Sequence, residues 1–187
     1  MKEEDKLIYK AKEGEAQAFG KLYDQYMPAI YRFIFFRVGG RKSDAEDLSH
    51  QVFLSAWQNI KRYEFQGFPF SSWLYRIAHN AIIDYYRTSK SHLAIENIPE
   101  EISAENSDIE EKLDRDLKLK LVKSALTELE PDQQNVGLMK FVNDLSNKEI
   151  ATALDKSEGA IRVIQHRALK QLKGIIENGE NHNTTII

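Results

Sequence analysis

The sequence predicts an all-α protein made of two small helical domains joined by a flexible acidic linker. Apolar side chains recur at three- and four-residue steps through most of the chain, which is the period of an amphipathic helix, and no run alternates as a strand would. Of the 9 Phe, 2 Trp and 8 Tyr, only Phe141 lies beyond residue 92, so two cores of different character are expected. The stretch between them is acidic and has no aromatic residue.

Charge divides the chain in the same way. The net charge of -3 over 187 residues, taken alone, argues against a nucleic-acid binder. Residues 1–92 carry 14 basic and 11 acidic side chains, residues 93–119 carry 3 and 9, and residues 120–187 carry 9 and 9. A mildly basic block and a neutral block therefore flank an acidic strip.

The first domain, residues 1–92, is expected to hold about four helices. A short first helix ends at Gly14, and a second ends at Gly39-Gly40, with Pro28 expected to kink it or open it locally. A third starts at Ser43, where Glu46 completes a capping box. A fourth begins near Ser71 and runs to about Arg87.

The linker, residues 93–112, is too polar to bury enough apolar surface to offset the entropy of ordering it. The second domain, residues 113–176, has Pro131 well placed to open a helix. Near its end, two helices with Ser146 and Ser157 as caps flank a three-residue turn, which indicates a helix-turn-helix or a plain helical hairpin. The tail, residues 177–187, is expected to fray.

Enzymatic chemistry has little support in the sequence. The 5 His are scattered, and no phosphate-binding or nucleophile motif is present, so we expect a non-catalytic protein with no metal and no cofactor. Zero Cys is typical of a reducing compartment. The longest apolar run, Phe33–Phe36, is far too short to insert in a membrane, and a cytoplasmic protein is expected.

Eight aromatic residues fall between Tyr63 and Tyr86, interleaved with basic side chains. Basic groups beside aromatic faces hold unstacked single-stranded bases, although a core with a solvated face is the alternative. The polar face of the third helix is likewise either simply its solvent-exposed side or a docking surface for a basic partner helix.

Three segments, Ser43–Ile60, Phe68–Arg87 and Leu145–Leu172, resemble in order and spacing the bacterial sigma factors of the extracytoplasmic-function (ECF) group in the sigma-70 family. The resemblance implies a sigma-2 and a sigma-4 domain that bind core RNA polymerase and direct promoter-specific transcription initiation. It also implies three partners: the clamp coiled coil and flap of the polymerase, promoter DNA, and an anti-sigma factor.

The resemblance assigns roles to three sets of residues. The residues assigned to docking on the polymerase are Glu46, Asp47, Gln51 and Ser55. The residues assigned to recognition and melting of the minus-10 element include the pocket loop Phe65, Gln66, Gly67 and Phe68. Asn80 is assigned to contact with a base edge, and Arg76, Arg87 and Lys90 are assigned to contact with the DNA strand. Minus-35 recognition falls to Ser157, Glu158, Arg162, Gln165, His166, Arg167 and Lys170. The side chains kept for the core are Phe53, Trp57, Trp73, Leu74 and Ile77.

One stretch departs from the common family pattern. Relatives often show Thr-Val-Lys-Ser-Arg where this chain has Ala160–Ile164, with fewer polar side chains to read bases. The linker either threads through the polymerase cleft or is a solvated tether. The alternative functions are a polymerase-independent helix-turn-helix transcriptional regulator and a protein-interaction scaffold.

Overall fold

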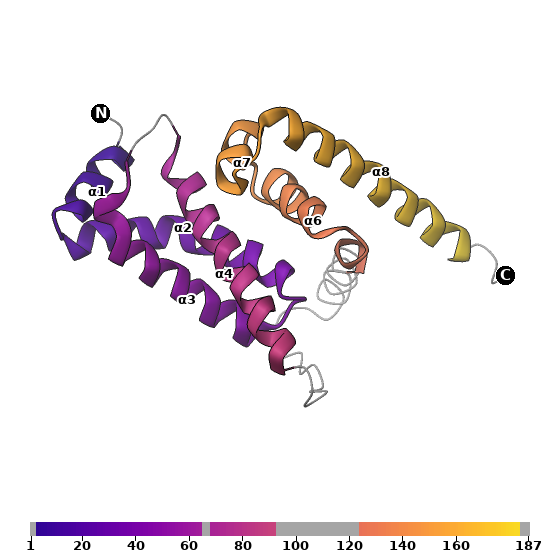
Figure 1. The fold of residues 1–187 in the computed structure, drawn as a ribbon, viewed down its shortest axis with the longest axis horizontal. Coiled ribbons are helices and arrows are strands. Elements are labelled where there is room, and N and C mark those ends of the chain that lie inside the picture. Colours follow the sequence, from indigo (N-terminus) through magenta and orange to yellow (C-terminus); the bar gives the residue numbers. More distant parts are fainter. Residues whose placement is uncertain (1–2, 65–67, 93–123, 184–187) are drawn as a thin grey trace, which may run out of the picture.

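The computed structural model describes residues 3–64, 68–92 and 124–183, and these residues form helices and turns with no strand among them (Figure 1). The all-α prediction is confirmed for these ranges. The first domain consists of α1 (Glu3–Lys12), α2 (Ala16–Arg37), α3 (Lys42–Asn59), the short 3-10 turn η1 (Ile60–Arg62) and α4 (Phe70–His92). The second contains α6 (Pro131–Gly137), the π-helical turn η2 (Leu138–Val142), α7 (Asn147–Leu154) and α8 (Glu158–Asn183). The linker predicted at residues 93–112 lies outside the described residues.

The core of the first domain is built around α2, which packs against α1, α3 and α4. Leu22, Ile30, Phe33 and Ile34 of α2 are fully buried. They meet the buried stripes of the neighbouring helices, which include Val52, Ala56, Leu74, Ala78 and Ile82. Each such large apolar side chain contributes about 1.5–3 kcal/mol through its burial. Within the described residues, no helix is both long enough and apolar enough to cross a membrane.

The start of α3 differs from the prediction. The helix begins at Lys42 with Arg41 at the N-cap position, so Ser43 lies inside the first turn and does not cap it. Arg41 instead pairs with Asp44, with 2.8 Å between Nε and Oδ2, and its guanidinium lies 5.4 Å from the ring centre of Tyr85. The Tyr85 hydroxyl donates to the same Asp44 oxygen at 2.6 Å. Tertiary contacts with α4 therefore replace the local cap.

Local sequence signals predicted one helix boundary correctly and placed another too early. Gly39 and Gly40 have φ angles of 73° and 81°, a left-handed conformation that glycine adopts without strain, and they end α2 as predicted. Pro28 lies within α2, which continues as helix on both sides of it. The helix α4 extends beyond its expected end to His92.

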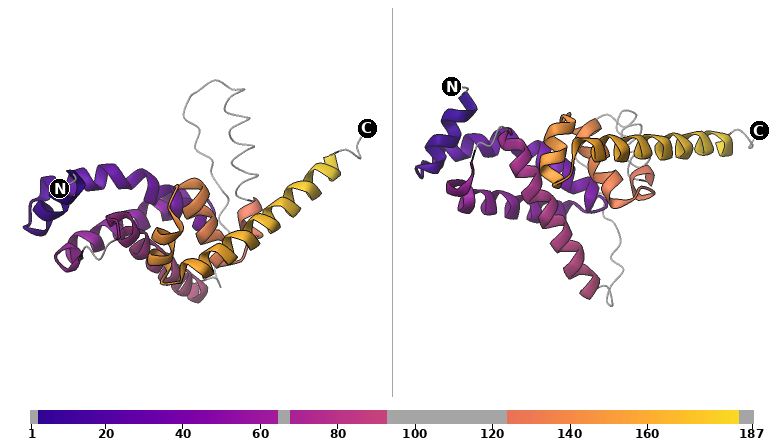
Figure 2. Two further views of the ribbon diagram at one scale, coloured as in Figure 1. Left: turned by 90° about the horizontal axis from the view of Figure 1, so that it is seen from above. Right: turned by 45° about the horizontal axis from the view of Figure 1, so that its top comes forward.

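The second domain keeps its predicted caps. Pro131 opens α6. The Ser146 hydroxyl accepts from the backbone of Glu149 at 3.2 Å, and Ser157 accepts from Ala160 at 3.1 Å. Asp155 turns the chain between α7 and α8 with a φ of 53°. The helix α8 continues past residue 176 and projects beyond the rest of the domain (Figure 2). The buried side chains of this domain include Val136, Leu138, Met139, Ile150, Leu154, Ile161 and Ala168.

The two domains pack against each other through α4 and α7, and η2 contacts α2. The Asn143 amide donates to the carbonyl oxygen of Ala29 at 3.0 Å, and the amide nitrogen of Asn135 lies 3.3 Å from Nδ1 of His79. Arg37 of α2 donates to the side chain of Gln134. These polar contacts join α2 and α4 of the first domain to α6 and η2 of the second.

Candidate polymerase and nucleic-acid interfaces

The polar face of α3 is open to solvent in the described structure. Glu46, Asp47 and Gln51 are exposed, and Ser55 is half-buried. The opposite face is the buried one and carries Ala45, Leu48, Val52, Phe53 and Ala56. The helix therefore presents acidic and amide groups outward from a rigid support.

An exposed leucine lies within this polar face. Leu54 is 57% exposed and stands at helical spacing from Asp47, Gln51 and Gln58. Leu54 was not among the predicted docking residues, but its position out of phase with the buried stripe is a sequence signal that marks it as exposed. On the neighbouring α2, burial raises the pKa of Tyr31, and the charge of the Glu46 carboxylate raises it further. Tyr31 is therefore a neighbour of Glu46, at the start of the polar face of α3.

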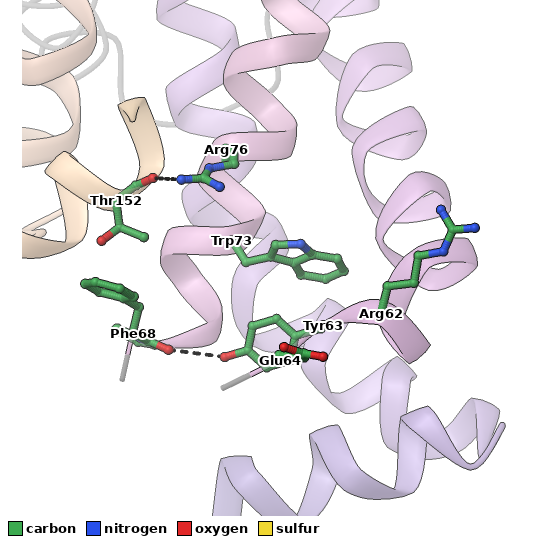
Figure 3. A pocket seen from close by; sticks show the side chains of 8 residues that line it. Arg62, Tyr63, Glu64, Phe68, Trp73, Arg76 and Thr152 are labelled. Atoms are coloured by element: carbon green, nitrogen blue, oxygen red, sulfur yellow. Dashed lines mark hydrogen bonds between the residues drawn. The ribbon is translucent and has the colours of Figure 1, made fainter. Parts of the chain in front are cut away.

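A pocket of about 240 Å³ opens beside the start of α4 (Figure 3). Its walls combine aromatic rings with two guanidinium groups, and they comprise Arg62, Tyr63, Glu64, Phe68, Pro69, Trp73, Arg76 and Thr152. Figure 3 shows Trp73 and Arg76 projecting from α4, with Tyr63 and Phe68 nearby. Such a pocket can accommodate a ligand whose flat ring stacks on the aromatic side chains and whose attached anion lies near the guanidinium groups.

Tyr63 fixes the geometry of the pocket. Its ring meets Phe70 edge-on at 5.3 Å between ring centres and lies 5.2 Å from Trp73. Its hydroxyl donates to the carbonyl oxygen of Phe68 at 3.2 Å. Burial, together with acidic side chains at the start of α1, raises the pKa of Tyr63 to about 12. The hydroxyl therefore keeps its proton at neutral pH and remains a donor.

The outward face of α8 is cationic. Its exposed side chains include Arg162, His166, Arg167 and Lys170, with Gln165 half-buried at the edge, and the apolar Val163 and Leu169 are exposed as well. Ile161 and Ala168 are fully buried on the other side, which is the orientation expected from the sequence. Arg162 lies 3.8 Å from the exposed Glu158, and a pair so open to water holds the guanidinium only weakly.

Comparisons with known proteins bear on these three surfaces. Residues 22–92 match Sigma-70 region 2, and residues 119–172 match Sigma-70 region 4. ECF RNA polymerase sigma factor SigD of Mycobacterium tuberculosis (strain H37Rv) is 30% identical over 175 residues, which cover 90% of this chain and 82% of SigD. The chain belongs to the ECF sigma factors of the sigma-70 family. This sigma factor is also 37% identical to ECF RNA polymerase sigma factor BldN of Streptomyces coelicolor, over 91% of its own length and 64% of that of BldN.

Solved structures share the fold of this sigma factor. CnrH, determined in complex with the cytosolic domain of CnrY, has a TM-score of 0.72 at 23% identity, covering 92% of this chain and 96% of that one. The sigma factor RpoE of Bartonella quintana, determined with the anti-sigma factor NepR, has a TM-score of 0.67 at 21% identity, covering 85% and 96%. The α3 face and all the pocket residues except Thr152 fall within the region 2 match. Thr152 and the α8 face fall within the region 4 match, and α1 precedes both.

The structure brings together only part of the predicted minus-10 set. Phe68 and Arg76 line the pocket, whereas Asn80 is exposed one turn further along α4 and Arg87 pairs with Asp84 at 3.0 Å. Phe65, Gln66, Gly67 and the side chain of Lys90 lie outside what the structure describes. Arg62, Tyr63 and Trp73 also line the pocket, although they belong to the aromatic and basic segment and not to the predicted minus-10 set, and Trp73 was expected in the core. The signal was the local density of aromatic residues, which cannot by itself separate a pocket wall from a core.

Helix α7 of the second domain covers one side of this pocket. Arg76 donates from Nη2 to the carbonyl oxygen of Thr152 at 2.5 Å, and its guanidinium lies 3.9 Å from Asp155. Lys148 places its ammonium 5.3 Å from the ring centre of Phe68. Two of the predicted minus-10 residues, Phe68 and Arg76, therefore contact the helix-turn-helix of the same chain in this structure.

Polar groups are also enclosed between the domains. Burial first, and then the charge of Arg37, lowers the pKa of His79. Arg37 is only 8% exposed, and its Nε and the Asn135 Oδ1 have no hydrogen-bond partner within the described residues. Buried polar groups left without partners weaken an interface. Among the described residues, no group of three His, Cys, Asp or Glu side chains is arranged to hold a metal ion.

Proposed function

We propose that this chain binds core RNA polymerase and directs promoter-specific transcription initiation in the cytoplasm, without catalytic chemistry of its own. The observation that carries the proposal is the presence of three separate surfaces on one member of the ECF sigma factors: the α3 face, the aromatic and basic pocket, and the cationic face of α8. Each surface has the chemistry that a different step of initiation needs.

The α3 face is proposed to dock on the clamp coiled coil of the polymerase through Glu46, Asp47, Gln51 and Ser55. Exposed carboxylates favour a basic partner helix and speed its encounter. Leu54 adds an apolar contact at the middle of this face, where truncation of a buried anchor usually weakens binding most. The flap of the polymerase is the proposed partner of the second domain.

The pocket is proposed to capture an unpaired base of the minus-10 element. Extruding a base costs unstacking energy, which stacking on aromatic rings repays. Phe68, Trp73 and Tyr63 supply those rings, while Arg62 and Arg76 attract the phosphates of the strand. Asn80, Arg87 and Lys90, along with the loop residues Phe65, Gln66 and Gly67, complete the predicted minus-10 set.

The cationic face of α8 is proposed to enter the major groove of the minus-35 element. In helix-turn-helix proteins, the N-terminal part of the second helix contacts base edges, which places Arg162 and His166 at the bases. Glu158, Gln165, Arg167 and Lys170 lie on the same face or its edges, and Ser157 serves as the cap of the helix.

Reading both elements requires the domains to separate. Elements centred about 25 base pairs apart lie about 85 Å apart along B-form DNA, whereas α4 and α7 are in direct contact. We propose that the described arrangement belongs to the free protein and that polymerase holds the open one. An anti-sigma factor would act by keeping these surfaces covered.

A selection from a genomic library tests the function. Core enzyme with this protein should transcribe fragments that share two conserved motifs at fixed spacing, whereas core enzyme alone should not. Absence of both polymerase binding and enrichment would refute the proposal. Tight, sequence-specific duplex binding by the free protein would favour the polymerase-independent regulator.

A further inference from the structure

Helix α1 reaches the pocket although it lies outside the family match that begins at residue 22. Lys12, in the last turn of α1, donates from Nζ to the carbonyl oxygen of Tyr63 at 2.7 Å. Its side chain is half-buried, so the ammonium is partly shielded from water where it makes this bond. A charge-assisted hydrogen bond of this length is among the stronger contacts that a surface lysine can make.

The contact of Lys12 continues across the pocket through Tyr63. The Tyr63 hydroxyl donates to the Phe68 carbonyl oxygen at 3.2 Å, and the same ring lies against Trp73. Lys12, Tyr63 and Phe68 are thus linked by two hydrogen bonds that join α1 to two walls of the pocket. Figure 3 shows the second of these bonds, from Tyr63 to Phe68. Any movement of the Tyr63 backbone would move both walls.

Helix α1 is a firm base for this chain of contacts. Ile8 and Ala11 are buried against the first domain, and the Tyr26 hydroxyl donates to Glu4 at 2.8 Å. The ring of Tyr26 in turn packs 5.7 Å from that of Phe70, at the start of α4. Lys12 is therefore presented by an element whose own position is fixed relative to the pocket.

We infer that Lys12 is a positioning residue for the pocket, holding Tyr63 and through it Phe68 in the arrangement that captures an unpaired minus-10 base. The inference rests on the proposed function, because it assumes that the pocket binds a base. A merely structural role, in which Lys12 satisfies the carbonyl at the end of η1, would affect stability and leave base capture unchanged.

The test uses holoenzyme assembled from core RNA polymerase and the full chain. The probe is a single-stranded oligonucleotide that carries the minus-10 strand of a promoter enriched in the library selection, compared with a scrambled oligonucleotide. Lys12→Met should reduce the ratio of the two affinities about five- to ten-fold, and Lys12→Arg should restore most of it. Lys10→Met is the matched control, since the ammonium of Lys10 lies 3.3 Å from the carboxylate of the exposed Glu15, and it should keep the wild-type ratio.

Two further measurements separate the outcomes. Core affinity should be unchanged in Lys12→Met, which shows that the first domain is folded, and Tyr63→Phe should lose selectivity in the same way because it removes the bond to Phe68. Wild-type selectivity in Lys12→Met would overturn the inference, whatever the result for Tyr63→Phe, and leave the proposed function intact. A wild-type holoenzyme that cannot tell the two oligonucleotides apart would instead refute the base-binding role of the pocket.

Discussion

The guanidinium of Arg76 donates a hydrogen bond of 2.5 Å to the carbonyl oxygen of Thr152, joining the pocket of the first domain to the helix-turn-helix of the second. Arg76 remains 46% exposed, so this contact and its ion pair with Asp155 are screened by water and are individually weak. An interface assembled from such contacts can be exchanged for a larger one on polymerase.

Separation of the domains can be measured directly. The chain has no cysteine, so Gln17→Cys on α2 and Leu169→Cys on α8 provide two exposed, unique labelling sites. The distance between the labels should be short and narrowly distributed in the free protein and should increase by tens of ångströms in the promoter complex. The same distance in both states would contradict the proposed opening.

Acid should weaken the structure around His79. The pKa of this group is lowered from its usual 6.5 by burial and then by Arg37 and Lys156, against the opposing effect of Asp132. As pH falls through about 6.5, an exposed His79 takes up a proton that the buried one does not, so stability is present above this pH and declines below it. Thermal unfolding midpoints between pH 7.5 and 5 should therefore fall more steeply for the wild type than for His79→Gln. Parallel curves would show that this histidine makes no contribution.

Replacing Asp47 and Gln51 together by Arg should weaken binding to core polymerase at least about ten-fold, because both charges then oppose a basic partner. Leu54→Ser should weaken it by a smaller factor through lost apolar contact. Asp24→Arg, an exposed charge reversal on α2, is the control and should bind as the wild type does. Unchanged affinity of the double variant would exclude the α3 face as the docking surface.

Arg162→Ala should reduce holoenzyme binding to the upstream promoter element about ten-fold, since a good base contact contributes about 1–3 kcal/mol of discrimination. Core affinity should not change, because Arg162 lies on the face of α8 that is proposed to meet DNA and outside the α3 face. Lys21→Ala, which removes an exposed charge on α2, controls for the general loss of one positive charge. Equal losses in the two variants would mean that Arg162 contributes only non-specific attraction.

The core prediction concerns Phe33, which is fully buried and meets Tyr75 edge-on at 5.4 Å between ring centres. Phe33→Ala should destabilise the protein by about 3–5 kcal/mol through lost burial and the resulting cavity. Tyr9→Ala, at a side chain that is 63% exposed, should change stability by less than about 0.5 kcal/mol. Denaturant unfolding of both variants tests the assigned core.

The spacing of apolar residues was sufficient to predict the helices and to show which faces of α3 and α8 are buried, because buried positions recur about once per helical turn. Ser146 and Ser157 were predictable as caps, since their partners lie three residues away. The cap at Ser43 was wrong because contacts of Arg41 and Asp44 with the distant Tyr85 determine that boundary. Neither the pocket role of Trp73 nor the contact of Arg76 with Thr152 could be predicted, since both depend on how distant segments pack.

Run-off transcription from one promoter recovered in the library selection tests the central claim most directly. Core RNA polymerase with the wild-type protein should give a transcript whose start maps to one position just downstream of the minus-10 motif, and core enzyme alone should give none. A protein that binds core enzyme without producing this transcript from any enriched fragment would contradict the assignment of promoter-specific initiation.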